Sequence, residues 1–142
     1  MLGALGREGT AVGILADSLL RAATSARFRP SLLNGNLALI SPFNPEAGFE
    51  VCNAMARNKY IYCLADAAIV IAADREQGGT WHGAVENLKH GWTPLWIKPH
   101  PDPASGNAEL IRRGGASCRR SWAIWRRCVA GRSCLQLIIR PL

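Results

Sequence analysis

The sequence predicts an α/β fold with a mainly parallel sheet of about four strands. Short apolar runs alternate with longer stretches of helical spacing, and the run at residues 67–73 (AAIVIAA) is apolar at every position. A strand buried between two helical layers has this pattern, because both of its faces contact apolar side chains. Alternation at this spacing favours parallel strands joined by right-handed crossovers. The ligand crevice of such a sheet lies beyond the carboxyl ends of its strands.

The first half of the chain contains two expected strands and two expected helices. The β-branched apolar run at 10–15 (TAVGIL) predicts a strand, and the apolar-rich stretch at 18–26 predicts a helix. Residues 37–40 (LALI) predict the next strand, which the two prolines within 41–45 (SPFNP) end. Apolar residues at three- and four-residue spacing then predict a helix over 46–64.

The second half repeats this order after the buried strand at 67–73. Residues 79–90 predict a helix that Gly91 and Pro94 end. Residues 95–97 predict a fourth strand, and residues 108–113 a short final helix. The apolar stripe of the longer helix consists of Trp81, Ala84, Val85 and Leu88.

Length and composition exclude several classes of protein. The chain has 142 residues, 49% of them hydrophobic and 19% charged, which suits one folded domain. No apolar run approaches the ~18 residues that cross a bilayer, and Arg7 and Glu8 precede the first apolar stretch, unlike a signal peptide. The five cysteines lack the close pairs of a zinc site and are expected to be reduced thiols. We therefore expect a cytoplasmic protein with no membrane partner, no metal and no cofactor.

The positive charge is concentrated at the carboxyl end. Residues 1–115 contain eleven Lys and Arg against ten Asp and Glu, whereas residues 116–142 contain six Arg and no acid. The net charge of +7 therefore does not indicate a basic surface over the whole fold. The Arg-, Cys- and Trp-rich tail at 117–142 has two interpretations, a basic aromatic arm or a segment that is not selected sequence, such as a shifted reading frame. The abrupt change of composition favours the second.

Two segments carry the candidate binding residues. After the buried strand, Gly78, Gly79 and Thr80 follow a polar loop and begin a helix, an arrangement that lets backbone N–H groups and a hydroxyl meet an anion. An ordinary strand-to-helix turn with a Thr cap is the alternative. Earlier in the chain, Arg57, Asn58 and Lys59 interrupt an apolar helix, and an Arg beside an amide suits a phosphate. The alternative there is a solvated pair of cations, since residues two apart on a regular helix point about 200° apart.

No catalytic residue is expected. His82, His90 and His100 have no nucleophile at a recognisable spacing, and the nucleotide-binding and hydrolase motifs are absent. The Gly106-Asn107 pair opens the last helix and is expected to serve packing first.

Taken together, these segments resemble the DNA-processing protein A family (DprA, also called Smf). That family has an Arg-Asn-Arg/Lys-x-Ile-x-x-Leu stretch, an apolar strand, a Ser/Gly-Gly turn that ends in Ala, and a closing Gly-x-Asn-x-Leu-Ile-x-x-Gly-Ala. The matching segments here are 57–64 (RNKYIYCL), 67–73, 78–84 (GGTWHGA) and 106–116 (GNAELIRRGGA). The order and spacing agree from about residue 9 to residue 116.

The resemblance implies a Rossmann-like three-layer α/β domain at 1–116, incomplete at its amino end, with residues 117–142 outside it. It implies a non-enzymatic protein that binds single-stranded DNA and helps load the RecA recombinase during natural transformation and recombination. Arg57, Asn58 and Lys59 would then contact backbone phosphates, and Gly78, Gly79 and Thr80 would line the pocket. A homodimer is a further expectation, because a truncated sheet exposes apolar edges.

The alternative is a relative in the same superfamily, the "lonely guy" (LOG) nucleoside monophosphate phosphoribohydrolases. Their Arg-Lys pair and Gly-Gly-x-Gly-Thr turn look similar to Arg57/Lys59 and to 78–80. However, Gly83 stands three residues after Thr80, where those enzymes have a Glu, and a glycosidic cleavage needs a carboxylate near the ribose. A nucleotide-sensing domain without activity is the third possibility.

Overall fold

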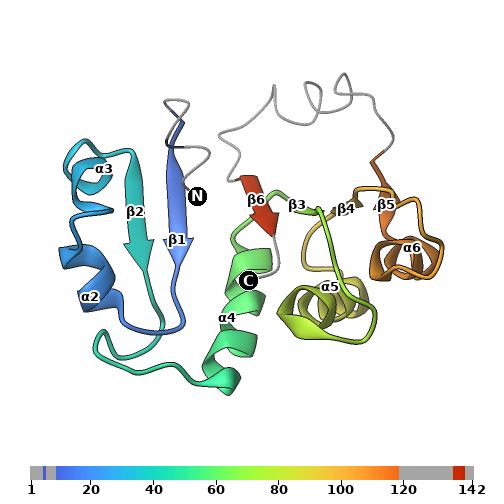
Figure 1. Ribbon diagram of the computed structural model, residues 1–142, viewed down its shortest axis with the longest axis horizontal. Helices are drawn as coiled ribbons and strands as arrows, with labels where there is room; N and C mark the ends of the chain where they lie inside the picture. The colour runs from blue at the N-terminus through green and yellow to red at the C-terminus, as the bar shows by residue number, and fades with distance from the viewer. Residues whose placement is uncertain (1–4, 6–8, 119–135, 140–142) are drawn as a thin grey trace. The chain divides into compact units, whose positions relative to one another are not determined.

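The structure, a computed structural model, describes residue 5, residues 9–118 and residues 136–139. The chain divides into two compact units, Met1–Tyr60 and Ile61–Leu142, and each has its own sheet (Figure 1). All strand pairs formed by the described residues are parallel. The predicted α/β fold is confirmed, with its strands divided between two sheets.

The first unit contains a two-stranded sheet and two short helices that connect its strands. β1 (Ala11–Ile14) pairs with β2 (Leu37–Ile40) over the full length of both strands. Between them in the chain lie α2 (Leu19–Thr24) and α3 (Arg29–Leu33). Both strands start and end within two residues of their predicted positions.

The helix predicted at 18–26 is shorter than expected. Thr24 is its last residue, and the Thr24 hydroxyl donates to the Leu20 carbonyl at 2.9 Å. Ser25 then takes extended backbone with ψ 139°, which ends the helix. α3 was not predicted from the sequence. Pro30 in its first turn is nevertheless a known start signal, since proline has no N–H to leave unpaired there.

α4 (Val51–Cys63) carries the candidate residues of the first unit, and its last three residues belong to the second. It begins five residues later than predicted. The Asn44 side chain accepts a hydrogen bond from the Glu46 N–H at 2.9 Å and so closes a turn around Pro45. This local bond competes with helix formation in the segment before α4.

The second unit contains a sheet with the strand order β5-β4-β3-β6. The two predicted strands are β3 (Ala67–Val70) and β4 (Leu95–Ile97), which form the centre of the sheet. β5 (Ala116–Ser117) pairs with β4, and β6 (Gln136–Ile139) pairs with β3 on its other edge. Neither outer strand was predicted.

The predicted boundary at residue 116 falls at the start of β5, and β6 lies within the predicted tail. Most of that tail, residues 119–135 and 140–142, lies outside the described residues. The division of the chain into 1–116 and 117–142 therefore stays a prediction.

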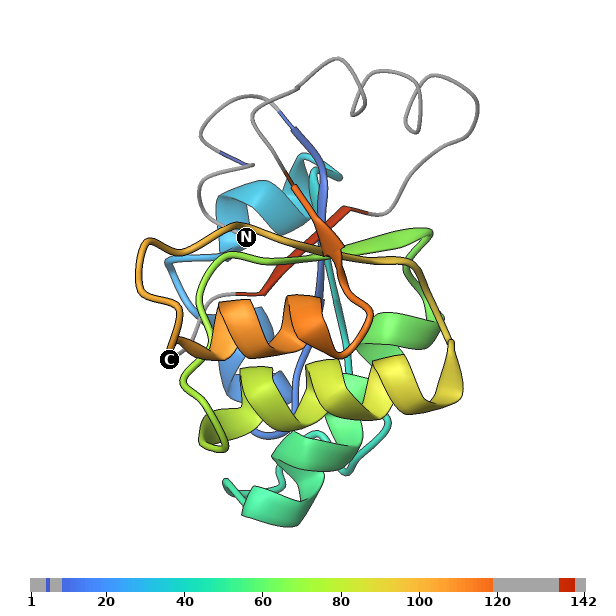
Figure 2. The ribbon, with the colours of Figure 1, turned by 90° about the vertical axis from the view of Figure 1, so that its right-hand side faces the viewer.

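Two helices of the second unit lie side by side and pack against β4 (Figure 2). α5 (Gly78–His90) contributes Trp81 and Ala84 to the core, and α6 (Gly106–Arg112) contributes Leu110. The predicted apolar stripe of α5 is confirmed, since its other two members also pack against this core. The core consists of Tyr62, Ala68, Val70, Ala73, Trp81, Ala84, Leu95, Ile97 and Leu110.

Asn107 ties the carboxyl ends of β3 and β4 to α6. Its side chain is 2% exposed; its Nδ2 donates to the carbonyls of Ile71 (3.0 Å) and Lys98 (2.7 Å), and its Oδ1 accepts from the Ala73 N–H (2.8 Å). A Cβ on the preceding Gly106 would collide with the Ala73 carbonyl, so only glycine permits this approach. The predicted packing role of the Gly-Asn pair is confirmed.

Candidate functional site

Arg57 lies at the carboxyl end of β1, the edge of a parallel sheet where ligands bind. From α4, one of its terminal nitrogens (Nη1) donates to the carbonyl of Ile14, the last residue of β1, at 2.8 Å. Its Nε is buried and has no hydrogen-bond partner among the described residues. The bond to Ile14 fixes the guanidinium in place, while the buried Nε–H has no acceptor among the described residues.

The electrostatics of Arg57 also suit an anion. Burial lowers the pKa of the guanidinium, and the negative charge of Asp17 opposes this with a weaker effect. Arginine starts from so high a pKa that the group stays protonated at neutral pH. A half-buried cation whose main fixed partner is a neutral carbonyl has charge left to attract an acceptor such as a phosphate oxygen.

Asn58 and Lys59 follow Arg57 on the same helix. Asn58 is half-buried, and Lys59 is exposed. α4 is helical from Val51 to Cys63, so Arg57 and Lys59 point about 200° apart around its axis. Because the helix neither begins nor bends at this segment, the three side chains do not converge on one small ligand.

Gly78, Gly79 and Thr80 form the first turn of α5 in the second unit. Gly78 has a φ of 73°, a left-handed conformation that favours glycine. Thr80 is the third helical residue and is 8% exposed, so it is not the cap that the sequence suggested. The N-cap is Gln77, whose side chain makes no capping hydrogen bond. Gly78 and Gly79 are exposed, so this turn presents backbone at the surface.

The predicted site residues thus form two groups. Arg57, Asn58 and Lys59 belong to the first unit, and 78–80 belong to the second. Each group is ordered by its own unit, Arg57 through β1 and the glycine turn through the start of α5.

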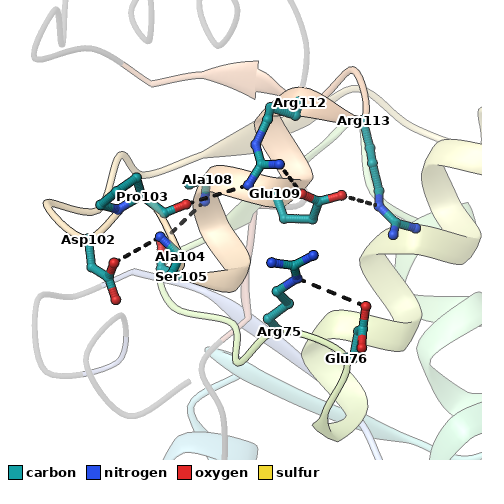
Figure 3. Close-up of polar contacts among 10 residues, drawn as sticks. All are labelled: Arg75, Glu76, Asp102, Pro103, Ala104, Ser105, Ala108, Glu109, Arg112 and Arg113. Atoms are coloured by element: carbon teal, nitrogen blue, oxygen red, sulfur yellow. Dashed lines mark hydrogen bonds and ion pairs between the residues drawn. The ribbon is translucent and has the colours of Figure 1, made fainter.

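Sequence reasoning missed an ionic cluster around Glu109 of α6 (Figure 3). Arg113 Nε donates to Glu109 Oε1 at 3.0 Å, and an Nη1 of Arg112 lies 2.7 Å from Oε2. The hydrogen bond from Arg113 is the main cause that lowers the pKa of the Glu109 carboxyl, and Arg112, Arg113 and Arg75 add to it electrostatically. The spacing of Glu109 from Arg112 and Arg113, three and four residues, is the helical ion-pair signal that could have revealed the cluster.

Two of the histidines considered for catalysis make local structural contacts. His90 stacks on Trp92 with ring centroids 4.9 Å apart, and His100 Nδ1 accepts from the Asp102 N–H at 3.1 Å. Gly83 is buried within α5, and Glu86 lies further along that helix. Among the described residues, no group of three His, Cys, Asp or Glu side chains could hold a metal ion. In the same part of the chain, no helix has the length and apolar character needed to span a membrane.

Comparison with known proteins agrees with this α/β architecture. The chain is similar to the solved structure of DNA processing protein A (DprA) from Streptococcus pneumoniae, with a TM-score of 0.65 and 22% sequence identity. That similarity covers 82% of this chain and 42% of the other, so this chain spans less than half of the longer protein. No curated protein sequence matched. The model of the family described as DNA recombination-mediator protein A matches residues 1–126, and the chain therefore belongs to that family of DNA-processing proteins.

Proposed function

We propose that this chain binds single-stranded DNA through the backbone phosphates and that Arg57 is its main contact in the first unit. The observation that carries the proposal is the guanidinium of Arg57, half-buried at the carboxyl end of β1 and fixed by the Ile14 carbonyl at 2.8 Å. The DNA-processing family supports nucleic acid as the partner. Asn58 and Lys59 add contacts along the strand, and Gly78, Gly79 and Thr80 offer backbone N–H groups in the second unit.

The proposed role is binding, not catalysis, and its expected setting is the cytoplasm. A DNA-processing protein of this kind would hold single strands for the RecA recombinase, which assembles on them during recombination. The phosphoribohydrolase alternative is disfavoured because Gly83 stands where that reaction requires a carboxylate. Incubation with nucleoside monophosphates should accordingly release no free base.

The test is fluorescence anisotropy of a labelled oligo-dT with the full chain over a series of salt concentrations. The Arg57→Ala variant should bind more weakly and with a shallower salt dependence, by about 0.7 in the log–log slope for each lost contact to a single strand. Arg21→Ala is the matched control, since Arg21 is exposed on α2 of the same unit and its loss removes the same charge. Equal binding by the Arg57 and Arg21 variants would overturn the proposal.

Assembly is tested separately. Large apolar side chains are exposed in the first unit, including Leu33 (78%) and Val51 (69%), which agrees with a homodimer. Light scattering coupled to size-exclusion chromatography measures the mass directly, and a single monomer peak across concentrations would exclude the dimer. Loading of RecA is measured by its filament formation on oligo-dT with and without this chain.

A further inference from the structure

We propose that Arg75, Arg112 and Arg113, here named the arginine cluster, form a second contact for DNA backbone phosphates on the second unit. The inference rests on the proposed function, and it assigns to DNA binding three residues outside the segments that the sequence singled out. Arg112 and Arg113 lie at the end of α6, and Arg75 lies in the loop between β3 and α5 (Figure 3).

Glu109 organises the cluster. Its side chain is only 12% exposed and has an ion pair with Arg112 (2.7 Å) and another with Arg113 (3.0 Å). The Arg113 guanidinium also lies over the buried ring of Trp81, 5.3 Å from its centroid. Two arginines are therefore held in place before any ligand arrives, which lowers the conformational entropy lost on binding.

The cluster has more cations than carboxylates. Glu109 is shared between two guanidinium groups, and the ion pair of Arg75 is with Glu76, which is 69% exposed and 3.9 Å away. Three positive charges thus face two negative ones, of which only Glu109 is tightly engaged. An exposed pair at such a distance is weak, so Arg75 stays available to another anion.

The exposed guanidinium groups have donors to spare. The side chains of Arg75, Arg112 and Arg113 are 48%, 60% and 44% exposed. Each guanidinium has five N–H donors. Apart from the ion pairs, the only acceptor that reaches the cluster among the described residues is the Pro103 carbonyl, 3.5 Å from Arg112. Their planar forks match the spacing of phosphate oxygens, which is why arginine so often binds phosphate.

The start of α5 adds to the positive potential. Arg75 lies three residues before α5, whose first turn (GGTW) contains no acid and whose N-cap side chain makes no capping hydrogen bond. Glu76, immediately before the N-cap, is exposed, so the partial positive charge of the helix N-terminus is not compensated from within the first turn. A phosphate at Arg75 would be attracted both by the guanidinium and by the N-terminus of α5.

The experiment uses the full chain, oligo-dT anisotropy and a salt series. The double variant Arg75→Ala/Arg112→Ala keeps Glu109 and Arg113 and should lose about tenfold in affinity, with the log–log salt slope reduced by about 1.4 for two contacts. The matched control is Arg21→Ala/Arg29→Ala, which removes two exposed arginines from the first unit. Equal thermal melting of the two double variants checks that the fold is retained.

A second variant should gain affinity for oligo-dT, an effect that loss of the fold does not produce. Glu76→Gln removes the exposed carboxylate that competes for Arg75 and should raise the affinity for oligo-dT two- to threefold at low salt. Glu46→Gln, an exposed acid of the first unit, is its control.

The outcomes separate this inference from the proposed function. If Arg57→Ala weakens binding and the cluster double variant matches its control, the arginine cluster is only a structural ion-pair network and this inference fails. If the cluster variant weakens binding and Arg57→Ala does not, the cluster is supported and the proposed role of Arg57 fails. If neither variant differs from its control, both fail.

Discussion

Asn107 should be among the residues most sensitive to truncation in the second unit. Its side chain makes three hydrogen bonds of 2.7–3.0 Å, to Ile71, Ala73 and Lys98, at a position that is 2% exposed. Asn107→Ala leaves one buried N–H and two carbonyls without that partner. At roughly 1 kcal/mol for each bond, the free energy of unfolding should fall by about 3 kcal/mol.

The assay is urea denaturation followed by tryptophan fluorescence. For a slope of about 2 kcal/mol per molar urea, that loss moves the midpoint down by about 1.5 M. Asn34→Ala is the control, because Asn34 is exposed after α3. Asn107→Asp keeps the acceptor for Ala73 but turns a carboxylate toward two carbonyls, so this variant should be less stable at pH 8 than at pH 5. A loss below 1 kcal/mol for Asn107→Ala would refute the role of Asn107 as a bridge between the strand ends.

Three further changes test the packing and the charges of the second unit. Tyr62→Phe should leave stability unchanged or raise it by about 1 kcal/mol in urea denaturation, because the buried hydroxyl, whose pKa burial raises, has no partner among the described residues; a loss above 1 kcal/mol would reveal one. Gly106→Ala should destabilise the chain, since the new Cβ would lie 2.9 Å from the Arg75 backbone nitrogen and closer still to the Ala73 carbonyl, and an unchanged melting temperature would contradict this packing. The lowered pKa of Glu109 stabilises the folded state above the unfolded-state pKa near 4.3, and this contribution is lost as the pH falls through the folded-state value. Glu109→Gln should therefore flatten the dependence of melting temperature on pH between about 5 and 3, and an unchanged profile would count against the ion pairs.

The fold class could be predicted because apolar periodicity reports burial directly. β3 and α5 are the clearest cases: the strand is apolar on both faces, and the stripe containing Trp81 and Ala84 is the face that packs. Periodicity carries less information where a single side-chain bond decides the outcome. The extended backbone of Ser25 ends α2 and the Asn44 side chain delays α4, and so both helices are shorter than predicted.

The candidate site was less predictable because its contacts join distant parts of the chain. Arg57 and Ile14 are 43 residues apart, and Asn107 and Ile71 are 36 apart. The sequence indicates that Arg57 suits a phosphate and that Asn107 serves packing. It does not indicate which backbone carbonyls each of them reaches, because carbonyls leave no residue-specific signal in the sequence.

The partner of each arginine should rank its contribution to anion binding. Arg57 is fixed by a neutral carbonyl and has only the weaker electrostatic effect of Asp17 on its charge, whereas the charge of Arg113 is compensated by Glu109 at 3.0 Å. Arg75 has the intermediate rank, because its acidic partner is 3.9 Å away and exposed. Single alanine variants should therefore weaken oligo-dT binding in the order Arg57, then Arg75, then Arg113, and the salt slope should shrink in the same order, since a compensated guanidinium releases fewer counterions from the DNA. The ranking would be refuted if Arg113→Ala lost the most affinity while its melting temperature stayed unchanged. That result would show that the ion pair with Glu109 opens on binding, so that the partners seen without DNA do not set the order.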